Sequence, residues 1–141
     1  MTLRCRSASP VSSPQITRAI PIAFVADVDA SAVFYRNVLG FTIDFLHGEP
    51  PFYGSISRGG ACIHLKFVHQ PVLTVSTDDR DDFITVFIEV DDVQSLFAEY
   101  VDTGAAFVHR LRTEPWGGLT FIVKDPDGNA LCFAGAPNTP A

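Results

Sequence analysis

The sequence is poor in the residues that build disulfide scaffolds and membrane spans. Its 141 residues include three cysteines, Cys5, Cys62 and Cys132, and no C-x-x-C pair. An odd, scattered set of cysteines argues against a disulfide framework and suits a reducing compartment, so we expect a cytoplasmic protein. No apolar run approaches the ~20 residues that a membrane helix needs, and the N-terminus lacks the apolar stretch of a secretory signal.

Basic residues are also scarce beyond the first 18 positions. The chain has 10 Lys and Arg against 16 Asp and Glu, a formal net charge of −6, and three of the basic residues are Arg4, Arg6 and Arg18. The rest of the chain therefore carries seven basic and 16 acidic residues, a net charge of −9. Such a surface repels a phosphate backbone and attracts cations, so we expect no nucleic-acid partner. The acidity also serves solubility, with or without a cationic ligand.

The chain has enough apolar residues for one buried core. Hydrophobic residues make up 47% of it, twelve of them Phe, and its length suits a single domain. Residues 1–18 are rich in Ser and Pro, and we interpret them as a flexible extension. Residues 19–135 are predicted to form the domain and residues 136–141 a tail.

Within the domain, one order of elements occurs twice. Residues 19–68 predict a first module whose helix begins at Asp27 or Asp29 and ends at Gly40, a residue type typical of helix C-caps. After a polar linker, residues 69–82, a second module over residues 83–135 has its helix between Asp91 or Asp92 and Gly104. The predicted strands cover residues 19–25, 41–46, 52–57, 61–67, 84–90, 106–111, 119–124 and 130–134.

The two modules match residue by residue. Val25-Ala-Asp-Val28 matches Val90-Asp-Asp-Val93, Tyr35 matches Tyr100 at an offset of 65, and Gly60 matches Gly128 at an offset of 68. A period this long indicates a duplicated module rather than a solenoid. The sequence therefore predicts an α+β fold in which two βαβββ modules form one curved mixed sheet. The helices should cover its outer face and leave a trough on the other.

Alternation within two matching strands predicts which side chains face the trough. In residues 61–67 the apolar side chains should face the helix, so that Cys62, His64 and Lys66 face the trough. The matching strand places Ala130, Cys132 and Ala134 on the same face, so His64 and Cys132 are equivalent positions. His47, His69 and His109 lie in or beside loops and are interpreted as solvated.

Two motifs in register with this duplication resemble the glyoxalase/bleomycin-resistance/extradiol-dioxygenase superfamily over about residues 19–135. They are Asp27-x-x-x-Ser31-x-x-Phe34-Tyr35-x-x-x-Leu39-Gly40-Phe41 and Asp125-Pro-Asp-Gly-Asn129. In metal-dependent members, four equivalent strands each supply one ligand, and the resemblance places these positions at Ile20, His64, Thr85 and Cys132. Isoleucine cannot ligate and threonine is a poor ligand. We therefore expect no metal and no other cofactor.

The resemblance is greatest to the metal-free bleomycin-resistance proteins. It implies a homodimer in which a second chain completes two grooves, and residues 19–22 resemble the N-terminal strand that those proteins exchange between subunits, with Pro21 at the hinge. It places Asp44, Phe45, Phe52 and Trp116 along the groove. The full set of expected ligand-binding residues is Asp44, Phe45, Phe52, His64, Lys66, Trp116, Gly128 and Cys132.

The leading functional hypothesis is a non-catalytic protein that sequesters a planar, cationic small molecule of the bleomycin type. Aromatic planes would stack on its rings and carboxylates would attract its positive charge. No catalytic motif is present, and no catalytic residue is predicted. Two alternatives stay open. One is a lyase, isomerase or dioxygenase with a degenerate metal site or with His64 or Glu89 as acid–base group, and the other is a metal-free binder of an unrelated metabolite.

Overall fold

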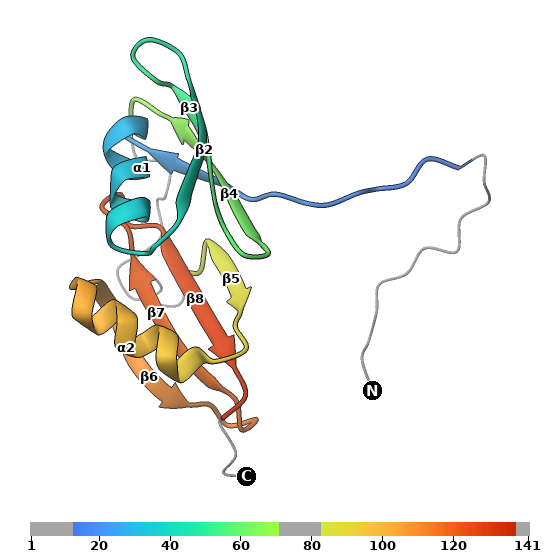
Figure 1. The fold of residues 1–141 in the computed structure, drawn as a ribbon, viewed down its shortest axis with the longest axis vertical. Helices are drawn as coiled ribbons and strands as arrows, with labels where there is room; N and C mark the ends of the chain where they lie inside the picture. Colours follow the sequence, from blue (N-terminus) through green and yellow to red (C-terminus); the bar gives the residue numbers. More distant parts are fainter. Residues whose placement is uncertain (1–12, 71–82, 138–141) are drawn as a thin grey trace.

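The computed structural model describes residues 13–70 and 83–137. The predicted extension, linker and tail lie largely outside these residues. The described part has the α+β class and the two modules that the sequence predicts (Figure 1).

The first module is a four-stranded mixed sheet with one helix. Its elements are β1 (Ile22–Val25), α1 (Val28–Asn37), β2 (Thr42–His47), β3 (Tyr53–Arg58) and β4 (Ala61–Phe67). The strand order is β1-β4-β3-β2, in which β1 runs parallel to β4 and the other pairs are antiparallel.

The second module repeats this topology. Its elements are β5 (Val86–Glu89), α2 (Val93–Thr103), β6 (Ala106–Thr113), β7 (Leu119–Lys124) and β8 (Ala130–Gly135). The order β5-β8-β7-β6, again with one parallel pair, β5 and β8, is the order of the first module element for element. The structure thus confirms the duplication.

Both helices begin at a predicted aspartate. The side chain of Asp27 accepts a hydrogen bond from the Ala30 amide and that of Asp92 from the Ser95 amide. Gly104, with a φ of 80°, caps α2 as predicted. The prediction for Gly40 is wrong, because α1 ends at its C-cap Val38, and Gly40 instead turns the chain into β2 with a φ of 75°. Neither of these helices is long and apolar enough to cross a membrane.

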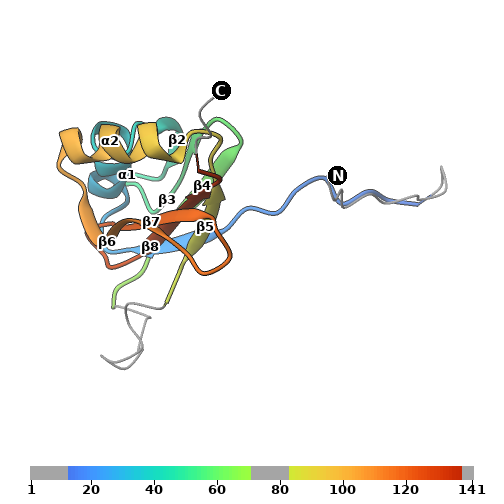
Figure 2. The ribbon, with the colours of Figure 1, turned by 90° about the horizontal axis from the view of Figure 1, so that it is seen from below.

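Helices α1 and α2 lie on the same side of the molecule and cover one face of each sheet (Figure 2). Under α1, Ile63 and Leu65 are fully buried, and Leu131 and Phe133 are their counterparts in the second module. The rings of Phe121 and Phe133 stack at 5.1 Å in that core. The predicted alternation in β4 and β8 is confirmed.

The two modules meet through the same tyrosine of each repeat. Tyr35 on α1 donates a 2.9 Å hydrogen bond to Asp125 in the turn between β7 and β8. Tyr100 on α2 donates one of 2.7 Å to the carbonyl oxygen of Leu39. Arg58, at the end of β3, donates to both carboxylate oxygens of Glu99. Side chains thus fix the relative position of the modules.

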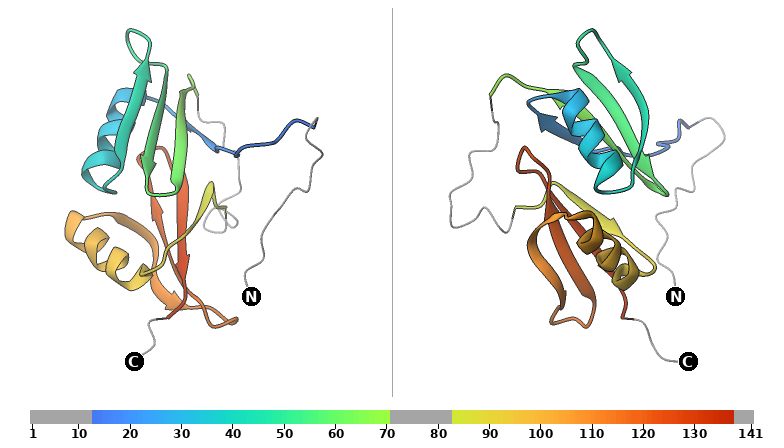
Figure 3. Two further views of the ribbon diagram at one scale, coloured as in Figure 1. Left: turned by 45° about the vertical axis from the view of Figure 1, so that its right-hand side comes forward. Right: turned by 60° about the vertical axis from the view of Figure 1, so that its left-hand side comes forward.

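The predicted pair of four-stranded βαβββ modules is confirmed, and no strand pairing joins the two sheets within the described chain. Its strands form two four-stranded sheets, stacked along the long axis of the molecule (Figures 1 and 3). Strands β1 and β5 are each an edge strand of their sheet. Strand β1 also starts three residues later than predicted, after Pro21, whose carbonyl oxygen accepts a bond from the His64 amide.

Candidate functional site

A β-bulge in β2 brings two unlike side chains onto the open face of the first sheet, the face away from α1. Ile43 pairs with Ile56 and Phe45 with Ser55, so Asp44 is the extra residue between them. A bulge breaks the strict alternation of a strand and lets neighbouring side chains project on one side. The same irregularity recurs in β6 between Phe107 and His109.

Two serines hold the Asp44 carboxylate. The Ser55 hydroxyl donates to Oδ2 at 2.9 Å, and the Ser57 hydroxyl donates to Oδ1 at 2.7 Å. Each carboxylate oxygen retains acceptor capacity after one such bond. Phe45 follows directly with 46% of its surface exposed. The open face therefore presents a fixed negative charge beside an uncovered aromatic ring.

His64 lies on the same face, next to these groups. Its Nδ1 is 2.8 Å from the Tyr53 hydroxyl, and its ring packs edge-on against Phe45 at 5.9 Å. The hydrogen bond between the Tyr53 hydroxyl and His64 Nδ1 orients the imidazole ring, whichever of the two atoms is the donor. Lys66, two residues further along β4, is exposed on the same face.

The open face of the second module contains a cavity of about 330 Å³. The residues that line it come from the second module alone. They are Ile84, Phe87, Val108, His109, Arg112, Glu114, Trp116, Thr120, Ile122 and Cys132. Trp116 is 73% exposed and Phe87 60% exposed, whereas Cys132 is buried at the base of the sheet. The cavity thus combines exposed aromatic walls with a charged pair, Arg112 and Glu114.

The charged pair acts on the thiol of Cys132. Burial raises the pKa of Cys132 above its ordinary value, the Glu114 carboxylate raises this pKa further, and the Arg112 guanidinium lowers it. The thiol is therefore protonated at neutral pH. His109 lies in the wall of this cavity, half-buried and partly in contact with solvent, with Nδ1 2.9 Å from the Arg110 carbonyl oxygen.

The structure divides the predicted binding residues among several places. Asp44, Phe45, His64 and Lys66 share the open face of the first module, whereas Trp116 and Cys132 belong to the cavity of the second. Phe52 precedes β3 and packs its ring against His47 at 5.3 Å, at the far end of the β2–β3 hairpin. Gly128, with a φ of 88°, lies in the turn between β7 and β8. Its neighbours are hydrogen-bonded to the first module: Asp127 accepts a bond from the Ala26 amide, and the Asn129 side chain donates to the Phe24 carbonyl oxygen in β1.

The sequence reasoning missed several residues of both faces. Tyr53, Ser55 and Ser57 could have been assigned from the alternation of β3, and Phe87 from that of β5. The positions of Arg112 and Glu114 on the open face could not be assigned in this way. A second register shift in β6, between His109 and Arg112, interrupts the alternation of side chains between the two faces of the sheet.

The residues at the family's four metal positions do not form a suitable donor set. Ile20 has a hydrocarbon side chain, and the Thr85 hydroxyl accepts a bond from the Ala130 amide at 3.2 Å. His64 is bonded to Tyr53, and the Cys132 thiol is protonated. Among the residues that the structure describes, no three His, Cys, Asp or Glu side chains are placed to hold an ion together. These residues do not fit a catalytic metal centre, which normally has three protein ligands.

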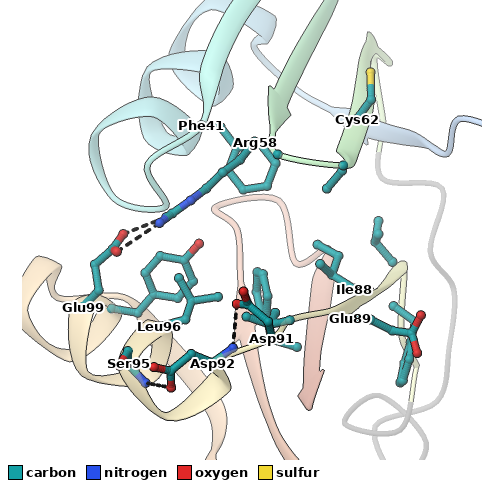
Figure 4. A pocket seen from close by; sticks show the side chains of 18 of the residues that line it. Phe41, Arg58, Cys62, Ile88, Glu89, Asp91, Asp92, Ser95, Leu96 and Glu99 are labelled. Carbon is teal, nitrogen blue, oxygen red and sulfur yellow. Dashed lines mark hydrogen bonds and ion pairs between the residues drawn. The ribbon is translucent and has the colours of Figure 1, made fainter. Parts of the chain in front are cut away.

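A larger cavity, about 810 Å³, lies between the modules (Figure 4). Its walls include Arg58 and Cys62 of the first module and β5 with the start of α2 in the second. Glu89, which the enzyme hypothesis considers as an acid–base group, lines this cavity, whereas His64 is not among its lining residues. The pairing of Arg58 with Glu99 closes one side of it.

Comparison with known proteins identifies one superfamily for this chain. The family model described as Glyoxalase/Bleomycin resistance protein/Dioxygenase superfamily covers residues 15–133. No curated protein matches the sequence. Among solved structures, the bleomycin-binding protein of Streptomyces verticillus, in complex with copper(II)-bleomycin, has a TM-score of 0.69 and 24% identity, covering 89% of this chain and 100% of its own.

Two further structures share the fold. The bleomycin resistance determinant encoded on transposon Tn5 has a TM-score of 0.69 and 20% identity, over 87% of this chain and 100% of its own. TioX from Micromonospora sp. ML1 has a TM-score of 0.65 and 19% identity, over 85% and 100%. The family model spans nearly the whole described chain, so this protein belongs to the glyoxalase/bleomycin resistance protein/dioxygenase superfamily.

Proposed function

We propose that this protein is a non-catalytic binding protein that sequesters a planar, cationic small molecule. Sequestration lowers the concentration of free ligand by mass action, without a bond being made or broken. Bleomycin is the first compound to test, since a structural neighbour is a bleomycin-binding protein solved with its drug. The described cysteines, Cys62 and Cys132, are free thiols, which suits action in the reducing cytoplasm.

The observation that carries the proposal is the fixed carboxylate of Asp44 beside the exposed ring of Phe45. Two serine hydroxyls orient the carboxylate before a ligand arrives, so little ordering entropy is lost on binding. An aromatic ring with a neighbouring carboxylate suits a flat cation, because the ring stacks and the carboxylate pairs with the charge.

The groove is proposed to need a second copy of the chain. The cavity at Trp116 is lined by the second module alone, and the Asp44 face belongs to the first. The edge strand β1 of the first module exposes two apolar side chains, Ile22 and Phe24. A dimer interface that buries these side chains would remove apolar surface from water, which favours association. A twofold dimer that joins the first module of one copy to the second module of the other would complete two grooves.

The experiment is calorimetric titration with copper(II)-bleomycin and with the metal-free drug. We expect binding by the wild-type protein with one site per chain, and a roughly ten- to hundredfold weaker affinity for Asp44→Asn, since one charge-assisted bond contributes about 1.5–3 kcal/mol. Asp102→Asn, the same carboxylate-to-amide change at an exposed residue of α2, is the matched control. No binding of either drug form by wild type would refute bleomycin as ligand.

One observation favours a second candidate function. The Tyr53 hydroxyl and His64 Nδ1, 2.8 Å apart on the open face, form a pair that could move a proton, as a lyase or isomerase requires. If the protein is an enzyme of this kind, Tyr53→Phe should lower turnover of its substrate by a larger factor than it lowers affinity. In a non-catalytic binding protein, Tyr53→Phe should lower the affinity for the ligand, and there is no turnover to lose.

A further inference from the structure

A guanidinium group with unused donors lines the cavity of the second module. Arg112 donates from Nε to Glu114 Oε1 at 3.0 Å. Within the described residues, its two Nη groups have no hydrogen-bond partner, although the guanidinium carries five N–H donors in all. The Glu114 side chain is 11% exposed and that of Arg112 57% exposed. The buried carboxylate therefore orients the guanidinium, and the free Nη edge remains available to a ligand.

The position of Arg112 relative to the cavity is supported by an independent effect. Both Arg112 and Glu114 act electrostatically on the Cys132 thiol, which lies across β7 at the base of the cavity. Strand pairing places Arg112 opposite Thr120, and Ile122 opposite Cys132, so these four residues line one continuous stretch of the sheet. Arg112 thus lines the cavity on the open face, with 57% of its side chain still exposed.

Aromatic side chains line the cavity at two other points. Phe87 projects from β5, one edge of the second sheet, and Trp116 from the turn between β6 and β7, at the other edge. That turn is closed by the Glu114 amide, which donates to the Gly118 carbonyl oxygen at 2.8 Å. A Cβ at Gly118 would lie 2.9 Å from Trp116 Nε1, so the glycine leaves room for the indole to approach its own turn closely.

From these contacts we infer that the second-module half of the groove binds a planar ring that carries an anionic or carbonyl acceptor. The ring lies between Phe87 and Trp116, and the acceptor receives two parallel hydrogen bonds from the Nη groups of Arg112. This inference rests on the proposed function and extends it. The ligand has a positive group for Asp44 at one end and an acceptor for Arg112 at the other. Arginine suits a carboxylate here because its fork matches the two carboxylate oxygens.

The test uses two flat probes of similar size and opposite charge, 2-naphthoate and (2-naphthylmethyl)ammonium, each titrated into the full chain by calorimetry. We expect Arg112→Gln to weaken 2-naphthoate about tenfold, the effect of losing a charge-assisted pair of bonds, and to leave the ammonium probe unweakened. Arg110→Gln is the matched control. It removes the same charge two residues away, from a side chain that lies over the Phe97 and Phe107 rings on the opposite face.

The outcomes separate this inference from the proposed function. If the ammonium probe binds and 2-naphthoate does not, the acceptor site is refuted and the cation-binding proposal stands. If 2-naphthoate binds and loses affinity with Arg112→Gln alone, the acceptor site is supported whatever the ammonium probe does. Equal losses with Arg110→Gln and Arg112→Gln would show a general charge effect and refute the site. Failure of both probes would refute both proposals.

Discussion

Tyr35 and Asp125, separated by 90 residues, form a buried hydrogen bond of 2.9 Å that connects the two modules. Asp125 also accepts bonds from the Asn129 side chain and from the amides of Asp127 and Asn129. Burial is the main reason why the pKa values of both Tyr35 and Asp125 lie above their ordinary values. Two of the sequence motifs thus meet at one buried contact.

Removal of this contact should destabilise the fold without affecting the ligand. Tyr35→Phe leaves Asp125 with one partner fewer in a buried position, so we expect a loss of about 1–3 kcal/mol in the free energy of unfolding, measured in urea. Tyr100→Phe, which removes a bond to the neutral carbonyl oxygen of Leu39, is the matched comparison, with an expected loss of about 0.5–1.5 kcal/mol. A smaller loss for Tyr35→Phe than for Tyr100→Phe would contradict the assigned role of Asp125.

The ion pair between the modules should give stability that depends on pH. The hydrogen bond from Arg58 is the main cause that lowers the pKa of Glu99 below its ordinary value. A lowered carboxyl pKa contributes stability above the unfolded-state value, and this contribution is lost as the pH falls through the folded-state value. The stability difference between wild type and Glu99→Gln should therefore be present at pH 7 and vanish in acid. The pair is partly exposed, so the difference is expected to be small.

Urea titrations at pH 7 and below pH 4 measure this difference. Glu49→Gln, at an exposed residue for which no ion pair is described, supplies the control. A Glu99→Gln difference that stays constant over this pH range would show that the carboxylate charge does not contribute.

Trp116 should be dispensable for folding and important for binding. Its side chain is 73% exposed, so Trp116→Ala is expected to change the free energy of unfolding by less than about 0.5 kcal/mol. The affinity for a stacking ligand should fall by about 1–3 kcal/mol. As the one Trp of the chain, it should also report binding through a change in its fluorescence. Unfolding of Trp116→Ala with unchanged affinity in the folded fraction would make it a core residue.

Gly118 offers a way to move the indole without removing it. Gly118→Ala places a methyl group 2.9 Å from Trp116 Nε1, so the ring has to shift. We expect weaker ligand binding and altered Trp emission in the free protein, with little loss of stability. Gly60→Ala, where a Cβ would meet nothing within 4 Å, is the matched control. Identical ligand affinity in both variants would show that ligand binding does not depend on the position of the indole.

The fold was more predictable from the sequence than the site. Capping aspartates, alternating strands and the 65-residue offset depend on local patterns, and they predicted both modules and the faces of β4 and β8. The relative position of the modules could not be predicted, because it depends on single long-range bonds such as that between Arg58 and Glu99. The bulge at Asp44 and the pairing of Arg112 with Glu114 likewise follow from strand register, which the sequence pattern does not specify.

The central claim is that each groove combines the first module of one chain with the second module of another. The most direct test mixes two variants, Phe45→Ala and Trp116→Ala, in differently tagged chains and titrates the purified mixed dimer with a stacking ligand. A groove shared between chains leaves one groove of the mixed dimer with both aromatic residues, so we predict one site per dimer at wild-type affinity. A mixed dimer without any site of wild-type affinity, or a chain that stays monomeric while it binds, would contradict the claim.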